Sequence, residues 1–248
     1  MIPWKTVDRA APPGGPELVL ARRADEWAIR AGGRLLMTSR THGSEEALAD
    51  LALAGVPRAR TVLLGGLGLG FTLRAALERL PADARVIVAE LVPQLVAWNR
   101  GPLAPLAGRP LEDPRVRLQL GDVRDRIAEA HGAFDAILLD VDNGPAPLSR
   151  AGNDRLYGDA GIRACRDALR AGGVLAVWSA GPDADFLERL TRAGLDAASH
   201  GVAARGPAGG VHHVVFVAKK LPPHAGRGPP RSPGAKGARG SPPRPRRR

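Results

Sequence analysis

From about residue 44 to residue 220, short apolar segments alternate with segments in which apolar residues recur at helical spacing. Strand-length apolar runs lie at residues 61–64, 85–89, 116–120, 134–139, 174–179 and 211–218. Helical patterns cover residues 70–80, 123–130, 159–170 and 183–193, and a further helix is expected around Pro93. A regular alternation of this kind predicts an α/β fold with a mostly parallel sheet and helices on both faces.

The segment before this alternation has a different pattern. Residues 1–16 end in AAPPGGP and are expected to form an irregular leader. Three short β-like runs follow within residues 17–43, and Gly32–Gly33 separates the last two runs as in a hairpin turn. We therefore expect a small antiparallel β unit at 17–43. Ser44 is a candidate N-cap for a helix that begins the large domain, which we place at 44–220.

Charge is concentrated at the end of the chain. The formal net charge of +11 includes ten Lys and Arg residues within 219–248, a stretch with no acid, so residues 1–218 carry a net charge of only +1. Residues 221–248 contain mainly Pro, Gly and Arg, which bury too little apolar surface to offset the entropy of an ordered chain. We expect a disordered basic tail there.

Cysteine and leader patterns favour a reducing compartment. Cys165 is the one cysteine of the sequence, so an intramolecular disulfide and a CxxC metal site are excluded. The first ten residues lack the pattern of a signal peptide, and no apolar run approaches the roughly 20 residues that span a bilayer. We expect a cytoplasmic protein that contacts no membrane and holds no metal.

The strand at 61–64 runs directly into a cluster of glycines in TVLLGGLGLGF, which we call the glycine loop. Its glycines are Gly65, Gly66, Gly68 and Gly70. A strand, a glycine turn and a helix in this order form the place where α/β sheets hold nucleotide-like ligands. The GxGxxG pattern of dinucleotide enzymes is not completed, because Phe71 stands at its third glycine. An adenosine ligand without a pyrophosphate fits better than NAD, and a tight turn without a ligand is the alternative.

Three later strands each end at a carboxylate. Glu90 lies twenty residues after Gly70, well placed to accept hydrogen bonds from ribose hydroxyls. Asp122 is placed either to accept from an adenine amino group or to cap the next helix. Asp140 follows a buried apolar strand, where a carboxylate needs a partner, and begins the segment DVDNGP. An Asx-type turn before Gly144 is the alternative for this segment, although it explains Asp140 poorly.

The order GGLGLG, VAE, LGD, FDAILLD and ALRAGGVLAVWS resembles the class I S-adenosylmethionine-binding fold. More narrowly, residues 17–218 resemble the spermidine synthase family of aminopropyltransferases. The resemblance implies a Rossmann-like, seven-stranded sheet of the methyltransferase type and a homodimer. It also implies cofactor binding by the glycine loop, Glu90 and Asp122, and catalysis by Asp140. Three positions depart from the family: Gly68 stands where an Asp is usual, Asn143 where the second Asp of D-x-x-D is usual, and Ser44 where a Tyr is usual.

Under the aminopropyltransferase interpretation, decarboxylated S-adenosylmethionine is the co-substrate and an amine such as putrescine is the acceptor. An alkylammonium with a pKa near ~10.4 must lose a proton before it attacks, and Asp140 is the candidate base. Substrate contacts are expected from Glu46, which matches a family glutamate, and from Asp142 and Asn143. Tyr157 either lines the same opening or packs in the core.

Two other functions remain open. A methyltransferase would hold intact S-adenosylmethionine in the same site, and the missing Asp at Gly68 favours it because an Asp would repel the cofactor carboxylate. The N-terminal β unit and the acidic DVDN segment favour the aminopropyltransferase. A non-enzymatic hypothesis has the basic tail bind nucleic acid or an acidic surface, although a solvated, disordered extension is the simpler explanation of that tail.

Overall fold

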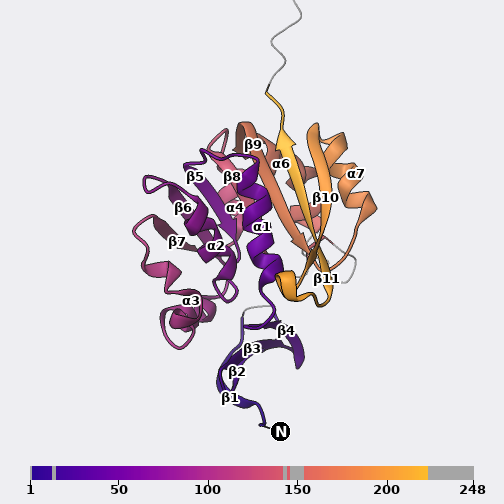
Figure 1. Ribbon diagram of the computed structural model, residues 1–248. Helices are drawn as coiled ribbons and strands as arrows, with labels where there is room; N and C mark the ends of the chain where they lie inside the picture. The colour runs from indigo at the N-terminus through magenta and orange to yellow at the C-terminus, as the bar shows by residue number, and fades with distance from the viewer. Residues whose placement is uncertain (1, 13–14, 142–143, 146–153, 223–248) are drawn as a thin grey trace, which may run out of the picture.

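Two β-sheets organise the chain in the computed structural model, which describes residues 2–12, 15–141, 144–145 and 154–222. The small sheet is antiparallel, with strands in the order β1-β2-β3-β4. Its strands are β1 (Lys5–Ala10), β2 (Leu18–Arg23), β3 (Glu26–Ala31) and β4 (Arg34–Thr38). It lies at one end of the molecule, beside the large domain that the rest of the chain forms (Figure 1).

The large sheet has seven strands in the order β10-β11-β9-β8-β5-β6-β7. They are β5 (Thr61–Gly65), β6 (Arg85–Glu90), β7 (Val116–Leu120), β8 (Phe134–Leu139), β9 (Leu169–Ser179), β10 (Leu195–Ala203) and β11 (His212–Lys220). Strands β5 to β9 pair in parallel, whereas β11 runs antiparallel to both β9 and β10. The expected seven-stranded, mostly parallel sheet is confirmed. The hydrophobic pattern did not indicate β10, because this edge strand is largely exposed and has few large apolar residues.

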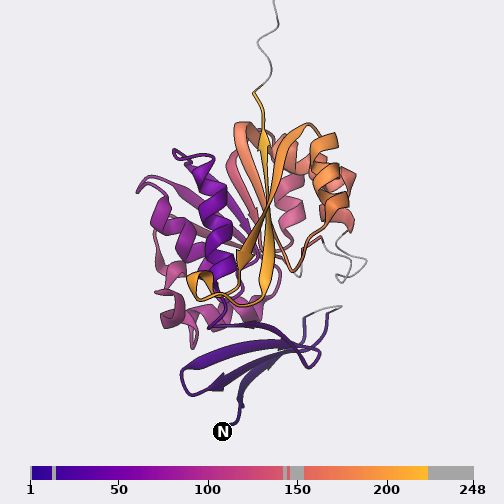
Figure 2. The same ribbon diagram turned by 45° about the vertical axis from the view of Figure 1, so that its right-hand side comes forward.

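Helices cover both faces of the large sheet (Figure 2). The first face carries α1 (Gly43–Ala54), α2 (Phe71–Arg79) and α3 (Pro93–Arg100), and the second carries α4 (Val123–Ala128), α6 (Asp159–Ala168) and α7 (Ala184–Arg192). Alternation along β5 separates the two cores, since Val62 and Leu64 pack on the first face and Leu63 on the second. Four short elements complete the described chain: η1 (Ala104–Ala107), η2 (Pro110–Glu112), α5 (Asp154–Tyr157) and η3 (Gly206–Ala208).

The prediction of an irregular leader over residues 1–16 was wrong for its middle part. Strand β1 pairs with β2 along its length and is tied to α3 by a side chain. Asp8 accepts hydrogen bonds from Nε1 of Trp98 at 2.7 Å and from Nε2 of Gln94 at 2.6 Å. The polar composition of residues 5–10 does not indicate a strand, and β1 is held in place by its pairing with β2 and by the contacts of Asp8 with α3.

Ser44 does not cap the first helix of the large domain. Helix α1 begins at Gly43, and Ser44 lies fully buried inside its first turn. A close backbone contact fixes this start: the amide of Gly43 donates to the carbonyl of Ala204 at 2.9 Å, and a Cβ on Gly43 would lie 2.2 Å from the nitrogen of Gly206. Tertiary packing therefore sets the start of the helix, and the Ser44 hydroxyl is left for another partner.

The small sheet packs against the glycine loop and α3. Leu18, Leu20 and Ile29 form one buried cluster with Leu69 and Phe71 of the loop region, and with the α3 and η1 residues Leu95, Trp98, Leu103 and Ala107. The small sheet therefore packs directly against the glycine loop and is part of the same buried core.

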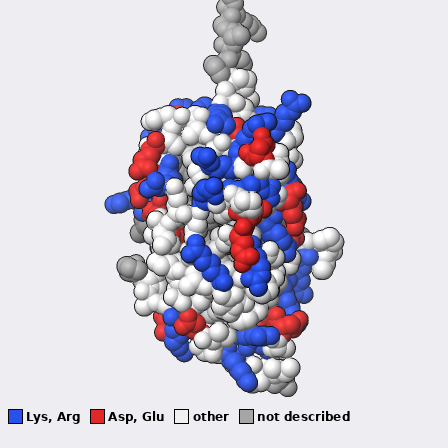
Figure 3. Space-filling model, turned by 90° about the vertical axis from the view of Figure 1, so that its left-hand side faces the viewer, with Lys and Arg blue, Asp and Glu red and all other residues white. Residues whose placement is uncertain are grey.

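Opposite charges are interspersed on the face of the molecule that Figure 3 shows. Examples of close ion pairs are Arg115 with Asp113 at 2.8 Å and Arg60 with Asp83 at 2.6 Å. Among the described residues, no helix is both long and apolar enough to cross a membrane. The expected tail, from residue 223 onward, lies outside the described residues.

Candidate active site

The glycine loop and Asp140 meet where the strand order of the sheet reverses. Strand β5 lies between β6, which follows it in the chain, and β8, which comes after β7. Connections from β5 and β8 leave toward opposite faces, and α/β sheets bind ligands in the crevice that this reversal opens. The amide of Asp140 donates to the carbonyl of Gly65 at 2.9 Å, so the two strand ends are held side by side.

Two of the loop glycines are required by geometry. Gly66 has φ of 87°, and a Cβ there would lie 2.2 Å from the backbone oxygen of Asp140. Gly70 has φ of 85° and immediately precedes α2. Both positions favour glycine because L-residues rarely adopt positive φ. The loop thereby brings backbone close to the crevice, as a nucleoside-binding turn needs.

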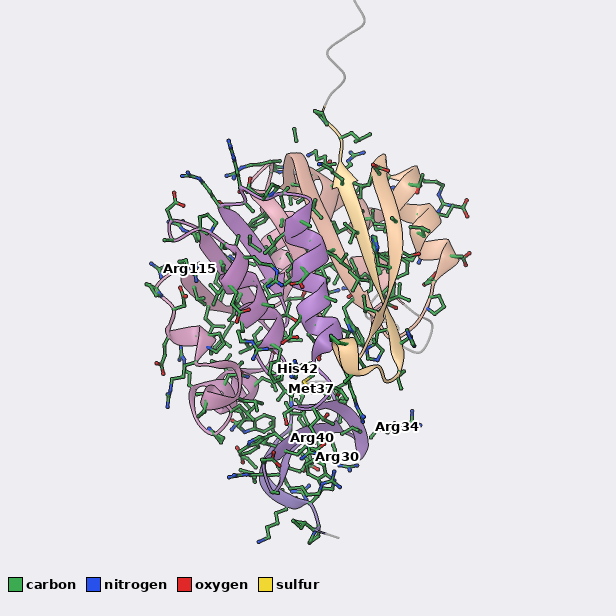
Figure 4. All side chains as sticks on the ribbon, in the orientation of Figure 1. Arg30, Arg34, Met37, Arg40, His42 and Arg115 are labelled. Carbon is green, nitrogen blue, oxygen red and sulfur yellow. The ribbon has the colours of Figure 1, made fainter. Side chains whose placement is uncertain are left out.

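Gly68 is a half-buried turn of the loop, and a side chain there would meet one neighbouring side chain of the described residues. Its φ is 50°, and among the described residues only atoms of Met37, from β4, lie within 4 Å of an ideal Cβ, with Sδ at 3.4 Å. Met37 and the neighbouring His42 lie at the junction between the small sheet and the large domain (Figure 4). A thioether thus faces the position where the resembling family carries an acid.

Asn99 fixes the position of the glycine loop through a hydrogen bond to its backbone, a role that the sequence did not indicate. Its Nδ2 donates to the carbonyl of Gly68 at 2.9 Å and to the carbonyl of Leu95 at 2.9 Å, and the residue is only 2% exposed. A buried amide that bridges a helix and a loop fixes the loop position. No motif indicates it, because its partner lies 31 residues away in the chain.

Glu90 lies beside the loop at the end of β6, as expected. Its Oε2 accepts from the amide of Leu67 at 2.8 Å, its Oε1 accepts from the amide of Val92 at 2.8 Å, and it is 4% exposed. The carboxylate therefore joins the backbone that follows β5 to the backbone that follows β6. Contact with a ribose remains a prediction.

Asp122 caps α4, which confirms one of its two expected roles. Oδ1 accepts from the amide of Arg124 at 2.8 Å, and the guanidinium of Arg124 contacts Oδ2 at 2.6 Å. Partial burial acts to raise the pKa of Asp122, but the hydrogen bonds from Arg124 outweigh it and hold the pKa below its usual range. Asp122 is therefore ionised at neutral pH, and contact with an adenine amino group remains a prediction.

Asp140 is half-buried at the end of β8. Its Oδ2 accepts a hydrogen bond from Oγ1 of Thr72, in α2, at 2.6 Å. Burial raises the pKa of Asp140 above its ordinary value, and the hydrogen bond from Thr72 offsets only part of that rise. A carboxylate that burial makes more basic is suited to accept a proton.

Glu45, in the first turn of α1, is a second carboxyl group at this place that sequence reasoning missed. Burial and the neighbouring charge of Asp140 raise the pKa of Glu45 to about 8. Oγ of Ser44 donates to its Oε2 at 2.8 Å. The adjacent acids Glu45 and Glu46 were visible in the sequence, but only the fold shows that the first faces Asp140.

Glu46 lies on the same helix, but its carboxylate pairs with an arginine. Its Oε1 forms a salt bridge with Arg74 of α2 and lies 3.0 Å from Nδ1 of His42. The His42 ring stacks on Phe71 with ring centres 4.1 Å apart. The structure therefore places Glu46 beside the site with its charge balanced, and a contact with substrate stays a prediction.

Tyr157 is buried, and its described contacts match a packing role. Its ring meets Phe186 edge-on at 5.7 Å, and its hydroxyl donates to the carbonyl of Val141 at 3.3 Å. This bond supports the backbone directly after Asp140. The expected substrate residues Asp142 and Asn143 lie outside the described residues.

Comparison with known sequences places the similarity in one half of the chain. No family model matches. A polyamine aminopropyltransferase from Nitrosomonas europaea is 37% identical over 123 residues, which is 50% of this chain and 35% of that protein. Putrescine N-methyltransferase 4 from Nicotiana tabacum is 34% identical over 131 residues, which is 52% of this chain and 32% of that protein. The similar segment thus spans about a third of each relative.

Comparison with solved structures extends the similarity over most of the chain. A spermidine synthase in complex with the transition state analogue AdoDATO superposes with a TM-score of 0.70 at 18% identity, over 87% of this chain and 72% of that chain. The spermidine synthase from Thermotoga maritima gives the same TM-score and identity, over 87% and 73%. The class defined by sheet order and superposition is therefore the spermidine synthase-like form of the methyltransferase-type α/β fold. The resemblance noted in the sequence is confirmed at the level of the fold.

Proposed function

We propose that this chain is a transferase that moves an aminopropyl group from decarboxylated S-adenosylmethionine to an amine such as putrescine. The observation that carries the proposal is the position of Asp140, a carboxyl of raised pKa at the strand reversal, held beside the glycine loop. The similarity to an aminopropyltransferase and the fold shared with spermidine synthases support it.

The residues of the crevice fit an adenosine-type sulfonium. Gly66 and Gly68 let backbone approach, Asn99 fixes the loop, and Glu90 stands at its side. When bound, the cofactor supplies a carbon bonded to a positively charged sulfur, a group that leaves as a neutral thioether. No acid is therefore needed on the leaving-group side.

The residues of the protein act mainly on the amine, which they must position and deprotonate. Its nitrogen must be uncharged to attack, and it carries a surplus proton once the new N–C bond has formed. Asp140 holds the amine in line and accepts that proton, and the pKa raised by burial makes it a better acceptor than an exposed Asp. Thr72 keeps the carboxylate oriented through its hydrogen bond.

A methyltransferase that uses intact S-adenosylmethionine is the second candidate, and Gly68 is the observation that favours it. Met37 rather than a carboxylate faces this position among the described residues. A cofactor carboxylate would meet no like charge there. The similarity to putrescine N-methyltransferases supports the same reading.

Thermal stabilisation by the two cofactors distinguishes the candidates. A ligand at a hundredfold excess over its Kd stabilises a folded protein by about 2.7 kcal/mol, which gives a measurable rise in Tm. The aminopropyltransferase predicts a rise with decarboxylated S-adenosylmethionine. A rise with the intact cofactor alone would exclude it.

Substitution of Gly68 tests which donor the loop selects. Gly68→Asp places a carboxylate where the aminopropyl ammonium is expected, so affinity for the decarboxylated cofactor should rise and affinity for the intact cofactor should fall. Gly68→Asn is the matched control, since Asn has the same size and tolerates the same positive φ without a charge. Equal effects of both substitutions would show that Gly68 does not face the donor.

A further inference from the structure

A chain of hydrogen bonds leads from Glu45 away from Asp140 and across to the edge region of the sheet. Oγ of Ser44 donates to Oε2 of Glu45 at 2.8 Å, and Nδ1 of His213 lies 2.9 Å from the same Oγ. Ser44 is in α1 and His213 is in β11, 169 residues later. Helix α1 packs over β8, β9 and β11, which brings these groups into one line.

The order of donors in this chain depends on the charge of Glu45. While Glu45 is a carboxylate, the Ser44 hydroxyl donates to it, so Nδ1 of His213 must carry the hydrogen that Ser44 accepts. Once Glu45 is protonated, its O–H can donate to Ser44, whose own hydrogen then points to an unprotonated Nδ1. In the two arrangements the same three groups are linked by the same two hydrogen bonds, but each bond has its donor and acceptor exchanged.

Burial shields the serine of this chain from solvent but leaves the histidine partly exposed. Ser44 is fully buried, with 0% exposure. His213 is half-buried, and its ring meets Trp178 edge-on at 4.7 Å. Burial lowers the pKa of the His213 imidazole, so the ring is neutral at physiological pH and able both to accept and to donate.

We propose that Glu45, Ser44 and His213 form a relay that carries away the proton taken up by Asp140. The inference rests on the proposed function, because alkyl transfer to an amine is what releases that proton. The amine nitrogen gives its electron pair to the new N–C bond, the electron pair of the broken C–S bond stays on sulfur, and the surplus proton passes to Asp140. Protonated Glu45 passes its own proton through the Ser44 hydroxyl to the unprotonated Nδ1 of His213, the imidazole releases the proton of Nε2 to solvent, and Glu45 takes up the proton held by Asp140. Exchange with solvent then returns His213 to the Nε2–H tautomer.

The charges around Glu45 fit a group that takes up and loses a proton near neutrality. Asp140 and Glu46 oppose its ionisation, and burial opposes it more strongly, which sets its pKa at about 8. Arg74 is engaged by Glu46 rather than by Glu45. Titratable and charged groups on the elements that pack around α1 include Asp140 directly after β8, Arg74 from α2, Arg205 next to η3, His213 from β11 and Glu46 on the same helix as Glu45.

Nuclear magnetic resonance of the full chain with ¹⁵N-labelled histidine tests the relay without reference to turnover. Between pH 7 and pH 9, His213 should change from the Nε2–H to the Nδ1–H tautomer as Glu45 ionises, and the change should vanish in Glu45→Gln. His213→Gln assigns the signal. An unchanged tautomer in the wild type, or the same change in Glu45→Gln, would overturn the relay.

Kinetics test whether the relay serves the reaction. His213→Gln and Ser44→Ala should each lower kcat by at least about tenfold and flatten the pH profile near pH 8, with unchanged affinity for the nucleoside product. His212→Gln and Ser199→Ala are the matched controls, because His212 is exposed beside His213 on β11 and Ser199 is exposed on β10, and they should match the wild type. Equal kcat and pH profiles for His213→Gln and His212→Gln would overturn the proposal.

The two experiments separate this inference from the function on which it rests. If the wild-type chain alkylates no amine while the His213 tautomer still changes with Glu45, the proposed function fails and only the hydrogen-bond coupling of Glu45 to His213 is supported. If amines are alkylated and the His213 tautomer does not change as Glu45 ionises, the proposed function is supported and the relay is wrong.

Discussion

Asp140 and Glu45 come from different elements, and their shared burial keeps them from ionising together at neutral pH. Burial raises the pKa of both carboxyls, and the charge of Asp140 adds to the effect on Glu45. Pairs of carboxyls held in this way are typical of sites that move protons. The same pKa shifts that suit the two carboxyls to proton transfer also make the free energy of unfolding depend on pH.

Glu45→Gln should make stability less dependent on pH. With a folded-state pKa of about 8 and an ordinary value of 4.5, Glu45 stays protonated in the folded chain while the unfolded chain ionises. Its contribution to stability is therefore present below pH 4.5 and is lost as pH rises to about 8. We expect the fall in Tm between pH 5 and pH 9 to be smaller in Glu45→Gln than in the wild type.

The exposed Glu188→Gln substitution is the control for this measurement, since Glu188 lies on the surface of α7 with 67% of its side chain exposed. It should leave the pH dependence of Tm unchanged. An identical fall in Tm for Glu45→Gln and the wild type would show that Glu45 ionises normally.

The sequence located some of these side chains and missed others for a physical reason. Glu90 and Asp140 end strands, and parallel strands bring their carboxyl ends to one edge, so their common placement followed from the strand pattern alone. Asn99 and His213 act on groups 31 and 169 residues away. Contacts of this kind depend on how helices pack on the sheet, which no local pattern specifies.

At the scale of elements, the turn from β5 to α2 depends on one close approach. Gly66→Ala would place a Cβ 2.2 Å from a backbone oxygen of Asp140, in addition to the cost of a positive φ. We expect a loss of about 3 kcal/mol or more in the free energy of unfolding, measured by chemical denaturation.

Gly33→Ala provides the matched comparison. Gly33 has φ of 79°, close to that of Gly66, but nothing among the described residues lies within 4 Å of its Cβ position. It should cost only about 1 kcal/mol, which is the backbone term alone. Equal losses for the two substitutions would mean that the contact with Asp140 does not constrain the loop.

Element boundaries show where local rules are overruled. The alternation of apolar segments predicted β5 to β9 and β11 correctly, since each of these strands contributes apolar residues to the buried cores. Local capping rules assigned Ser44 to the start of α1, but a backbone contact with Gly206 starts the helix at Gly43. The hydrophobic pattern did not predict the polar strands β1 and β10, because pairing with neighbouring strands, rather than apolar composition, holds them in place.

At the scale of the whole molecule, the small sheet and the glycine loop form one unit. Leu20 is fully buried in the cluster that also contains Leu69 and Phe71. Leu20→Ala should destabilise the protein by about 2–5 kcal/mol and also weaken cofactor binding, because the loop loses its support. Denaturation and cofactor titration measure the two effects.

Leu35→Ala is the control, because Leu35 lies on β4 of the same sheet but is 55% exposed. It should change neither quantity appreciably. Destabilisation of Leu20→Ala with full cofactor affinity would show that the small sheet folds against the loop without shaping the site.

The most direct test of the central claim is the identity of the nucleoside product. The full chain is incubated with intact or decarboxylated S-adenosylmethionine and a panel of amines, beside Asp140→Asn as the inactive control. Aminopropyl transfer predicts methylthioadenosine from the decarboxylated cofactor and a diamine, at a level lowered by about 10²-fold or more in Asp140→Asn. S-adenosylhomocysteine from the intact cofactor alone, or a product level that Asp140→Asn does not change, would contradict it.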